Sequence, residues 1–520
     1  MTFAPRADGT DALVVVAAQK PDTLAIVDDR PDGFLRELTF REVNDYVNRI
    51  ANALMARGFQ PGERLLWAGR NCVEAVVIQH AVRKVGGYSI ALNHRLQEEE
   101  VREIATVSEA TFAWAEGSFR EIFAKRALPK LRDVVIFDGE PGKGQLSLDD
   151  FLSGSSSEEP DFRRSAGCPY DPVLAFTGGT TGKPKGVVRY RLSPEESGMM
   201  ARLIGDGQGA FMVTGSLTHS GPNGMGNNSL MLGSTLVLQR RFDAEDWVRL
   251  VAKYRATNSY SAPYPVRHIS NLPKEVAERY DTSCLKTMMA AAAQWPFELK
   301  QAFLRAYPQC DLWEVYGSTE LASVALLSPA DQLRKPGSCG KVLDWVDVQL
   351  IDENDELVTE PHKPGVLYAR SDSVFHEYLG DPKASAEARR GEFATCGDIA
   401  YYDEEGFYYI VDRTKDMVIS AGVNIYPREV ENAIERHPAI FESAVIGLPD
   451  EEWGERLHAV VVAKPDVPVP SEEELVAHCR KHLASYKVPR SFAFTTELPH
   501  LLSGKIAKRE VRDRCLAEGA

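Results

Sequence analysis

The chain has 520 residues, of which 44% are hydrophobic and 26% charged, and its formal net charge is −15. This length predicts at least two domains, and this balance is typical of a globular protein with a large core. The acidic charge, without a long block of Lys and Arg, excludes an obvious track for a phosphate backbone. We therefore expect no nucleic-acid partner.

The first ten residues contain no basic stretch followed by an apolar core, and apolar runs such as Leu13–Ala18 are shorter than a membrane span. We expect no transmembrane segment and a cytoplasmic location. The eight cysteines are scattered singly without a CxxC pair, so we expect them to be reduced and buried. The residues leave the oligomeric state open between monomer and homodimer.

Helical and strand patterns alternate through the first half of the chain. After Leu38 apolar residues recur at helical spacing, and Pro61-Gly62 then precedes the strand-like segment ERLLWAG. The alternation recurs through Val73–Gly87, the segment VLAFTGG, and the strand STLVLQR ahead of a helix over Asp243–Arg255. This order predicts an α/β architecture with parallel sheets.

The pattern changes in the second half of the chain. After Gly340, short alternating segments predict a small antiparallel β-barrel unit. From Lys415 we expect a separate α+β domain, with helices over Pro427–Arg436 and Ser471–Leu483. The predicted domains are therefore 1–414 and 415–520.

A glycine-rich run, FTGGTTGKPKG, follows the apolar strand VLAF. Its glycines leave backbone N–H groups open to an anion, and Lys183 and Lys185 add positive charge, although an exposed flexible turn has the same composition. A P-loop would have a glycine five residues before Gly182 and Ser or Thr after Lys183. Thr177 and Pro184 occupy these positions, so a Walker-type ATPase is disfavoured.

This run resembles the [YF]TSGTTGxPKG signature of the adenylate-forming enzymes, which include acyl-CoA synthetases, luciferases and peptide-synthetase adenylation domains. Gly178 stands where Ser is common, which removes one hydroxyl contact to the phosphates. Because further motifs follow in the family order, the chain is identified as a member of the acyl-CoA synthetase branch. The resemblance implies a large domain that binds AMP and the acyl group, followed by a small mobile lid. It assigns nucleotide binding in this run to Thr177, Gly178, Gly179, Thr180, Thr181, Gly182 and Lys185.

Two further motifs supply candidate ligands for the nucleotide. WEVYGSTE resembles the second core motif, in which Tyr316 offers a ring for adenine stacking and Thr319 a hydroxyl for the α-phosphate. Glu320 offers a hard oxygen ligand for Mg²⁺. Cys396-Gly-Asp398 resembles the family's TGD, whose aspartate accepts hydrogen bonds from both ribose hydroxyls.

The segment DRTKDMVISAGVNIYPREVE resembles the family's GRxKDxIxxxGxNIxPxEIE, with Asp412 in place of the usual glycine. By this resemblance Arg413 binds the ribose, Lys415 is the hinge, and Gly422 passes close to the pantetheine arm of CoA. Trp453 resembles a position beside the CoA nucleotide, and a partly buried aromatic residue without a ligand is an equal alternative.

Lys505, in LSGKI, resembles the lysine that a flexible glycine presents to the reacting carboxylate and the α-phosphate. It is the leading catalytic candidate. His219 matches a gate beside the acyl tunnel, although a lone histidine is more often structural. His478 and His482 have an HxxxH spacing that suits a metal, but no glutamate or further ligand pair accompanies them, so a solvated helix face is favoured.

The resemblance implies ATP, Mg²⁺ and coenzyme A as cofactor and co-substrates, and a small carboxylic acid as substrate. The products would be acyl-AMP and pyrophosphate, and then acyl-CoA and AMP. Loading of an acyl group onto a carrier protein and luciferase chemistry share these motifs. An amino-acid substrate is disfavoured because no aspartate follows His219. A non-catalytic nucleotide-binding homologue is a further alternative.

The acyl pocket is the part about which the sequence is least informative. AAAAQWP occupies a segment that many relatives write SGGAPLP, so methyl groups at Ala291 and Ala292 change the pocket's shape. The neighbouring SAPYPVRHISNLP resembles ligases for medium or longer aliphatic, alicyclic or bulky carboxylates. Asn223, Asn227 and Asn228 would instead give a polar floor. The identity of the acid is left open.

Overall fold

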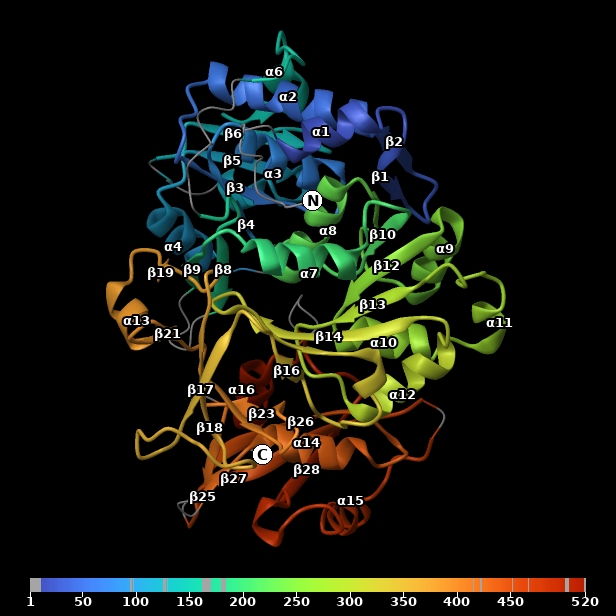
Figure 1. The fold of residues 1–520 in the computed structure, drawn as a ribbon, viewed down its shortest axis with the longest axis vertical. Coiled ribbons are helices and arrows are strands. Elements are labelled where there is room, and N and C mark those ends of the chain that lie inside the picture. The colour runs from blue at the N-terminus through green and yellow to red at the C-terminus, as the bar shows by residue number, and fades with distance from the viewer. Residues whose placement is uncertain are drawn as a thin grey trace.

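Figure 1 shows the computed structural model of the chain, with the N-terminal layers in blue at the top and the C-terminal elements in red at the bottom. The structure describes residues 11–93, 96, 98–124, 128, 130–160, 170–178, 184–414, 416–420, 423–450, 452–465, 467–500 and 505–518.

A parallel sheet with strand order β4-β3-β5-β6-β7 forms the N-terminal layers. Leu65–Ala68 of β3 are all buried, as expected of a parallel strand covered on both faces. The preceding helix, α2, begins at a capping box, in which Thr39 Oγ1 accepts from Glu42 N and the Glu42 carboxylate accepts from Thr39 N. The elements up to residue 160 are α1 Ala12–Gln19, β1 Leu24–Asp29, β2 Leu35–Thr39, α2 Phe40–Ala56, β3 Arg64–Ala68, α3 Val73–Lys84, β4 Tyr88–Ala91, α4 Glu98–Ser108, β5 Phe112–Glu116, α5 Glu121–Ala124, β6 Asp133–Phe137, β7 Leu146–Ser147 and α6 Leu148–Leu152.

A second, longer sheet begins with the order β2-β1-β11-β10-β12-β13-β14, and its pairings from β1 to β14 are parallel. The carboxyl ends of β10, β12, β13 and β14 therefore meet at one edge, where α/β proteins commonly bind ligands. The elements are β8 Ala175–Gly178, β9 Pro184–Val188, α7 Pro194–Ile204, β10 Ala210–Val213, α8 Ser220–Leu232, β11 Thr235–Leu238, α9 Ala244–Tyr254, β12 Ala256–Ser261, α10 Pro263–Ser270, α11 Lys274–Ala277, β13 Thr287–Ala290, α12 Phe297–Ala306 and β14 Asp311–Ser318.

From β14 onward the same sheet continues with antiparallel pairings through β15, β16, β23, β22 and β18. The antiparallel strands expected after Gly340 are thus joined to the parallel sheet. A separate hairpin, β8–β9, pairs with β19. The elements are β15 Ala322–Leu327, β16 Gly340–Val342, β17 Asp347–Ile351, β18 Gly365–Arg370, β19 Glu377–Tyr378, α13 Pro382–Glu387, β20 Arg389–Arg390, β21 Phe393–Ala394, β22 Asp398–Tyr402 and β23 Phe407–Arg413.

The C-terminal domain has its own sheet, with the order β25-β24-β27-β26 and β28 parallel to β27. Val430 of α14 and Leu475 of α15 pack on one face of this sheet, and Val511 of α16 packs on the other. The helix expected over Ser471–Leu483 is shorter, because Ser471 is the N-cap and turns begin at residue 480. The elements are β24 Val418–Ser420, β25 Val423–Ile425, α14 Pro427–Glu435, β26 Ile440–Asp450, β27 Gly454–Ala463, α15 Glu472–Cys479, β28 Ser491–Thr495 and α16 Lys508–Glu518.

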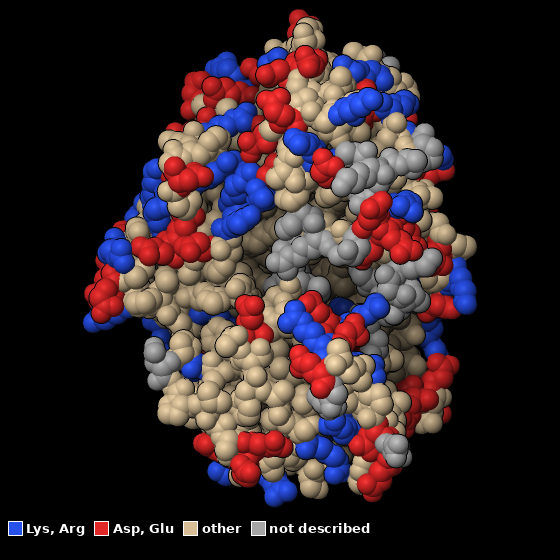
Figure 2. All heavy atoms as spheres, turned by 180° about the vertical axis from the view of Figure 1, so that it is seen from behind, with Lys and Arg blue, Asp and Glu red and all other residues tan. Residues whose placement is uncertain are grey.

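The predicted α/β architecture with parallel sheets and a separate C-terminal domain is confirmed. The boundary between residues 414 and 415 stays a prediction. Within the described ranges, no helix combines the length and the apolar character needed to cross a membrane. The described cysteines are free thiols, and all of them except Cys396 are buried. Acidic and basic side chains are interspersed over the face shown in Figure 2, which is hollowed near its middle.

Candidate active site

Asp398, the first residue of β22, is the centre of a buried polar cluster. Its Oδ1 accepts a hydrogen bond from Arg413 Nε at 3.0 Å, and its Oδ2 accepts from Tyr316 Oη at 2.8 Å and Cys396 Sγ at 3.2 Å. Burial, and then the charge of Asp398, raise the pKa of the Tyr316 hydroxyl and of the Cys396 thiol, so both groups stay protonated donors at neutral pH. Three motifs separated in sequence therefore meet at one carboxylate.

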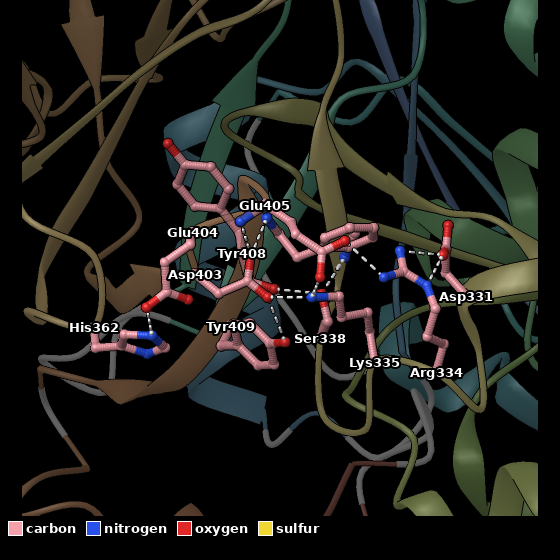
Figure 3. Close-up of polar contacts among 12 residues, drawn as sticks. Asp331, Arg334, Lys335, Ser338, His362, Asp403, Glu404, Glu405, Tyr408 and Tyr409 are labelled. Atoms are coloured by element: carbon pink, nitrogen blue, oxygen red, sulfur yellow. Dashed lines mark hydrogen bonds and ion pairs between the residues drawn. The ribbon is translucent and has the colours of Figure 1, made fainter.

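The β22–β23 hairpin fixes this geometry, because its register places Asp398 opposite Arg413. At the turn of the hairpin, Asp403 accepts hydrogen bonds from Lys335 Nζ at 2.8 Å and Tyr409 Oη at 3.1 Å (Figure 3). Burial opposes ionisation of Asp403, but these and the backbone donors lower its pKa to about 2. The turn is thereby attached to the loop that contains Lys335. The end of the hairpin remote from the turn carries Asp398 and Arg413.

Thr319 and Glu320 lie in the turn between β14 and β15, at the carboxyl edge of the parallel strands. Glu320 Oε1 accepts a hydrogen bond from Tyr378 Oη at 3.0 Å, and Thr319 Oγ1 lies 3.4 Å from Ser220 Oγ. Burial, and then the charge of Glu320, raise the pKa of Tyr378, so its hydroxyl remains a donor. Tyr378 was not among the residues predicted from the sequence, because its segment, HEYLG, carries no motif.

The glycine-rich run is held by the β8–β9 hairpin, in which Thr177 pairs with Lys185. Lys185 Nζ, in β9, lies 4.9 Å from the centre of the Tyr378 ring. Because the Tyr378 hydroxyl also donates to Glu320, Tyr378 connects β9 to Glu320. Several predicted site residues lie outside the described residues, namely Gly179, Thr180, Thr181, Gly182, Lys415 and Gly422. Their predicted roles stay predictions.

His219 is the N-cap of α8, in the connection that follows the carboxyl end of β10. Its Nε2 is buried and has no hydrogen-bond partner within the described part of the chain. Burial, and then the positive charge of Lys505, lower the pKa of His219 to about 4. The C-terminal domain therefore brings the charge of Lys505 within electrostatic reach of His219.

The depressed pKa of His219 predicts a dependence of stability on pH. Between a folded pKa of about 4 and the ordinary value of 6.5, the unfolded chain binds a proton that the folded chain does not, so the free energy of unfolding falls as the pH falls through this window. Replacing His219 by Asn should reduce the slope of the free energy of unfolding against pH by up to about 1.4 kcal/mol per pH unit. Denaturant unfolding at several pH values in the window measures the slope, and equal slopes for the two proteins would contradict this account.

Two glycines of α8 give a matched pair of variants. A Cβ atom at Gly221 would lie 2.2 Å from Tyr260 Oη, whereas Gly224 has no neighbour within 4 Å of such an atom. Gly221→Ala should destabilise the protein by about 1–3 kcal/mol through overpacking. Gly224→Ala should stabilise it by about 0.5–1 kcal/mol, because alanine loses less backbone entropy in a helix. Thermal unfolding compares the two variants, and shifts of the same sign would argue against this packing.

Two features bear on the acyl pocket expected from the sequence. Ala292, which replaces a glycine of the resembled segment, has φ +70°, the left-handed region that glycine adopts without strain. Asn227 Nδ2 donates to Asn223 Oδ1 at 2.6 Å, and Asn223 Nδ2 donates to Gln79 Oε1 of α3 at 2.8 Å. These two amides are thus engaged with each other and with α3.

The remaining predicted residues lie in the C-terminal domain. Trp453 is in the turn between β26 and β27, and the guanidinium carbon of Arg490 lies 4.1 Å from the centre of its ring. The rings of His478 and His482 are 4.9 Å apart, and His478 Nε2 donates to the carbonyl oxygen of Ala433 at 3.0 Å. Trp453 and His478 thus both contact residues of the C-terminal domain itself.

Comparisons with known proteins agree with this arrangement. The family model for AMP-binding enzymes matches residues 13–379, and the model for the AMP-binding enzyme C-terminal domain matches residues 429–505. The chain is 33% identical over 484 residues to the feruloyl-CoA synthase of an Amycolatopsis species, covering 92% of this chain and 94% of that protein. It is 31% identical over 487 residues to the long-chain-fatty-acid–CoA ligase FadD13 of Mycobacterium tuberculosis, covering 92% and 93%.

Among solved structures, the anthranilate CoA ligase AuaEII in complex with anthranoyl-AMP shares the fold, with a TM-score of 0.85 at 24% identity over 98% of each chain. The chain belongs to the AMP-binding enzymes, which are the adenylate-forming superfamily, and to their acyl-CoA synthetase branch. It is an AMP-forming acid–thiol ligase, as the motifs predicted, and ligases of this class use ATP and CoA.

Proposed function

We propose that the chain is an acyl-CoA synthetase, which forms acyl-AMP and pyrophosphate from a carboxylic acid and ATP and then transfers the acyl group to the thiol of CoA. The observation that supports this proposal best is the buried cluster in which Tyr316 and Arg413, from two separate motifs, donate hydrogen bonds to Asp398. The feruloyl-CoA synthase and the long-chain-fatty-acid–CoA ligase named above, which the chain matches over almost their whole length, support it.

The polar cluster around Asp398 suits a nucleoside. Asp398 would accept hydrogen bonds from the ribose hydroxyls, and Arg413 would neutralise the buried carboxylate and contact the same sugar. Tyr316, whose hydroxyl donates to Asp398, would lie beside the adenine. Thr319 and the amides of the glycine-rich run would face the phosphates.

Mg²⁺ would be held by Glu320 together with the phosphates of ATP, where it would neutralise charge on the pyrophosphate. In the described part of the chain no group of three or more His, Cys, Asp or Glu side chains forms a metal site by itself. One carboxylate plus substrate phosphates is, however, the usual way in which proteins hold Mg²⁺. The buried Glu320 carboxylate, oriented by Tyr378, fits this requirement.

The first half-reaction joins two anions, because a carboxylate oxygen attacks the α-phosphorus and pyrophosphate leaves. Positive charge fixed between the reacting groups lowers the energy of this transition state. Lys505 would supply that charge from the C-terminal domain. In the second half-reaction the CoA thiol loses its proton to solvent, its sulfur attacks the acyl carbon, and AMP leaves with the electrons of the bond to that carbon. Lys505 must withdraw to admit the thiol.

The test is ATP–pyrophosphate exchange across aliphatic, alicyclic and aromatic carboxylic acids, followed by detection of a thioester with CoA. Exchange with at least one acid and formation of its CoA thioester are the expected results. Absence of exchange with every acid would overturn the proposal in favour of a non-catalytic nucleotide-binding protein. Exchange without a CoA thioester, together with acylation of a phosphopantetheinyl carrier protein, would identify a carrier-loading enzyme instead.

A further inference from the structure

Helix α10 of the large domain contacts the C-terminal domain through Arg267. Its Nη2 lies 2.9 Å from Glu435 Oε2 at the end of α14, and its Nη1 donates to the carbonyl oxygen of Phe441 in β26. The Glu435 side chain is 3% exposed and that of Arg267 is 15% exposed, so this ion pair is shielded from water. Glu435 Oε1 also accepts from the backbone of Ser443, which fixes the carboxylate toward α10.

The same helix also contacts β26 and the segment that precedes Lys505, the lysine proposed for adenylation. The ring of Tyr264 lies 4.9 Å from the ring of His500, and the ring of His268 lies 5.8 Å from that of Phe441. His500 forms an antiparallel bridge with Ile506, the residue after Lys505. The position of His500 is therefore tied through the backbone to the position of Lys505.

A second contact between the domains lies at the other end of α14. Asp412, at the end of β23, accepts a hydrogen bond from Arg428 N at 2.9 Å, and Arg428 Nη2 donates to the carbonyl oxygen of Gln294 at 3.2 Å. Helix α14 is thus attached to the large domain near both of its ends. Loss of one attachment leaves the other, so it should change the orientation of the domain without unfolding it.

We propose that Arg267 is a positioning residue for adenylation, which holds the C-terminal domain in the orientation that presents Lys505 to the site. This inference rests on the proposed function, in which Lys505 serves only the first half-reaction and must leave before the second. Breaking a buried ion pair leaves an unpaired charge, so removal of Arg267 disfavours this orientation strongly. Because the second half-reaction uses a different orientation of the C-terminal domain, the Arg267–Glu435 ion pair does not accelerate it.

The experiment measures the two half-reactions separately in Arg267→Gln. Pyrophosphate exchange reports the first, and CoA thioester formation from supplied acyl-AMP reports the second. We expect exchange to fall about tenfold or more, as for loss of a hydrogen-bonded charge, while thioester formation stays the same or rises. Arg267→Lys, which keeps a cation facing Glu435, should give an intermediate ratio of the two rates.

The matched control is Arg249→Gln. Arg249 lies on the neighbouring helix α9 and pairs with Asp29 at 3.0 Å, with both partners inside the large domain, so the ratio should stay at the wild-type value. An unchanged ratio in Arg267→Gln, or equal loss of both half-reactions, would overturn the inference. If the glutamine variant does not fold, the ratio of the two half-reaction rates is measured in Arg267→Lys instead. A wild-type protein without exchange would instead refute the proposed function.

Discussion

Replacing Lys505 by alanine is expected to lower the rate of acyl-AMP formation by about 10²–10³-fold while sparing thioester formation from supplied acyl-AMP. Burial, and then the charge of Lys505, lower the pKa of the His219 imidazole, so this charge acts on the region of His219. A group in that position can offset the repulsion between the carboxylate and the α-phosphate. Loss of one such preorganised charge typically lowers the rate by about 10²–10³-fold.

The measurement uses pyrophosphate exchange for the first half-reaction and supplied acyl-AMP with CoA for the second. Arg509→Ala is the control, because it removes a positive charge from the same tail at a side chain that is 80% exposed. The control should keep both rates. Equal losses in both half-reactions of Lys505→Ala would show that the lysine stabilises the domain and does not act in adenylation.

Sequence patterns predicted the parts of this protein that depend on local information. Buried apolar segments between helices predicted the parallel strands, because a strand covered on both faces has few polar positions. Asp398, Arg413 and Tyr316 were predicted as nucleotide ligands from three separate motifs, and the structure brings them together. Their hydrogen bonds to one another could not be predicted, because they depend on the register of β22 with β23.

The contacts that join remote segments were not predictable in the same way. Neither Tyr378 nor Arg267 was singled out as a site residue from the sequence, because each acquires its partner only where two distant segments meet. The antiparallel strands were expected as a small unit, yet they extend the parallel sheet through β14 and β15. The pattern of a strand reports which faces are buried, but it does not report which strand lies beside it.

Discrimination against 2′-deoxyATP should depend on Asp398. If both ribose hydroxyls donate to this carboxylate, wild-type protein should prefer ATP by about 10–100-fold in kcat/KM, the effect of one hydrogen bond to a charged group. Asp398→Ala should lower kcat/KM for ATP by at least that factor and should lose the preference, because no carboxylate remains to detect the missing hydroxyl. Loss of Asp398 also removes the ion-pair partner of Arg413, and because the Arg413 side chain is 36% exposed, the free energy of unfolding should fall by only about 1–3 kcal/mol. Loss of stability can be distinguished from loss of the ribose contact. Instability lowers the rates with ATP and 2′-deoxyATP equally and leaves their ratio unchanged. A variant that still prefers ATP as strongly as the wild type would therefore place the ribose elsewhere.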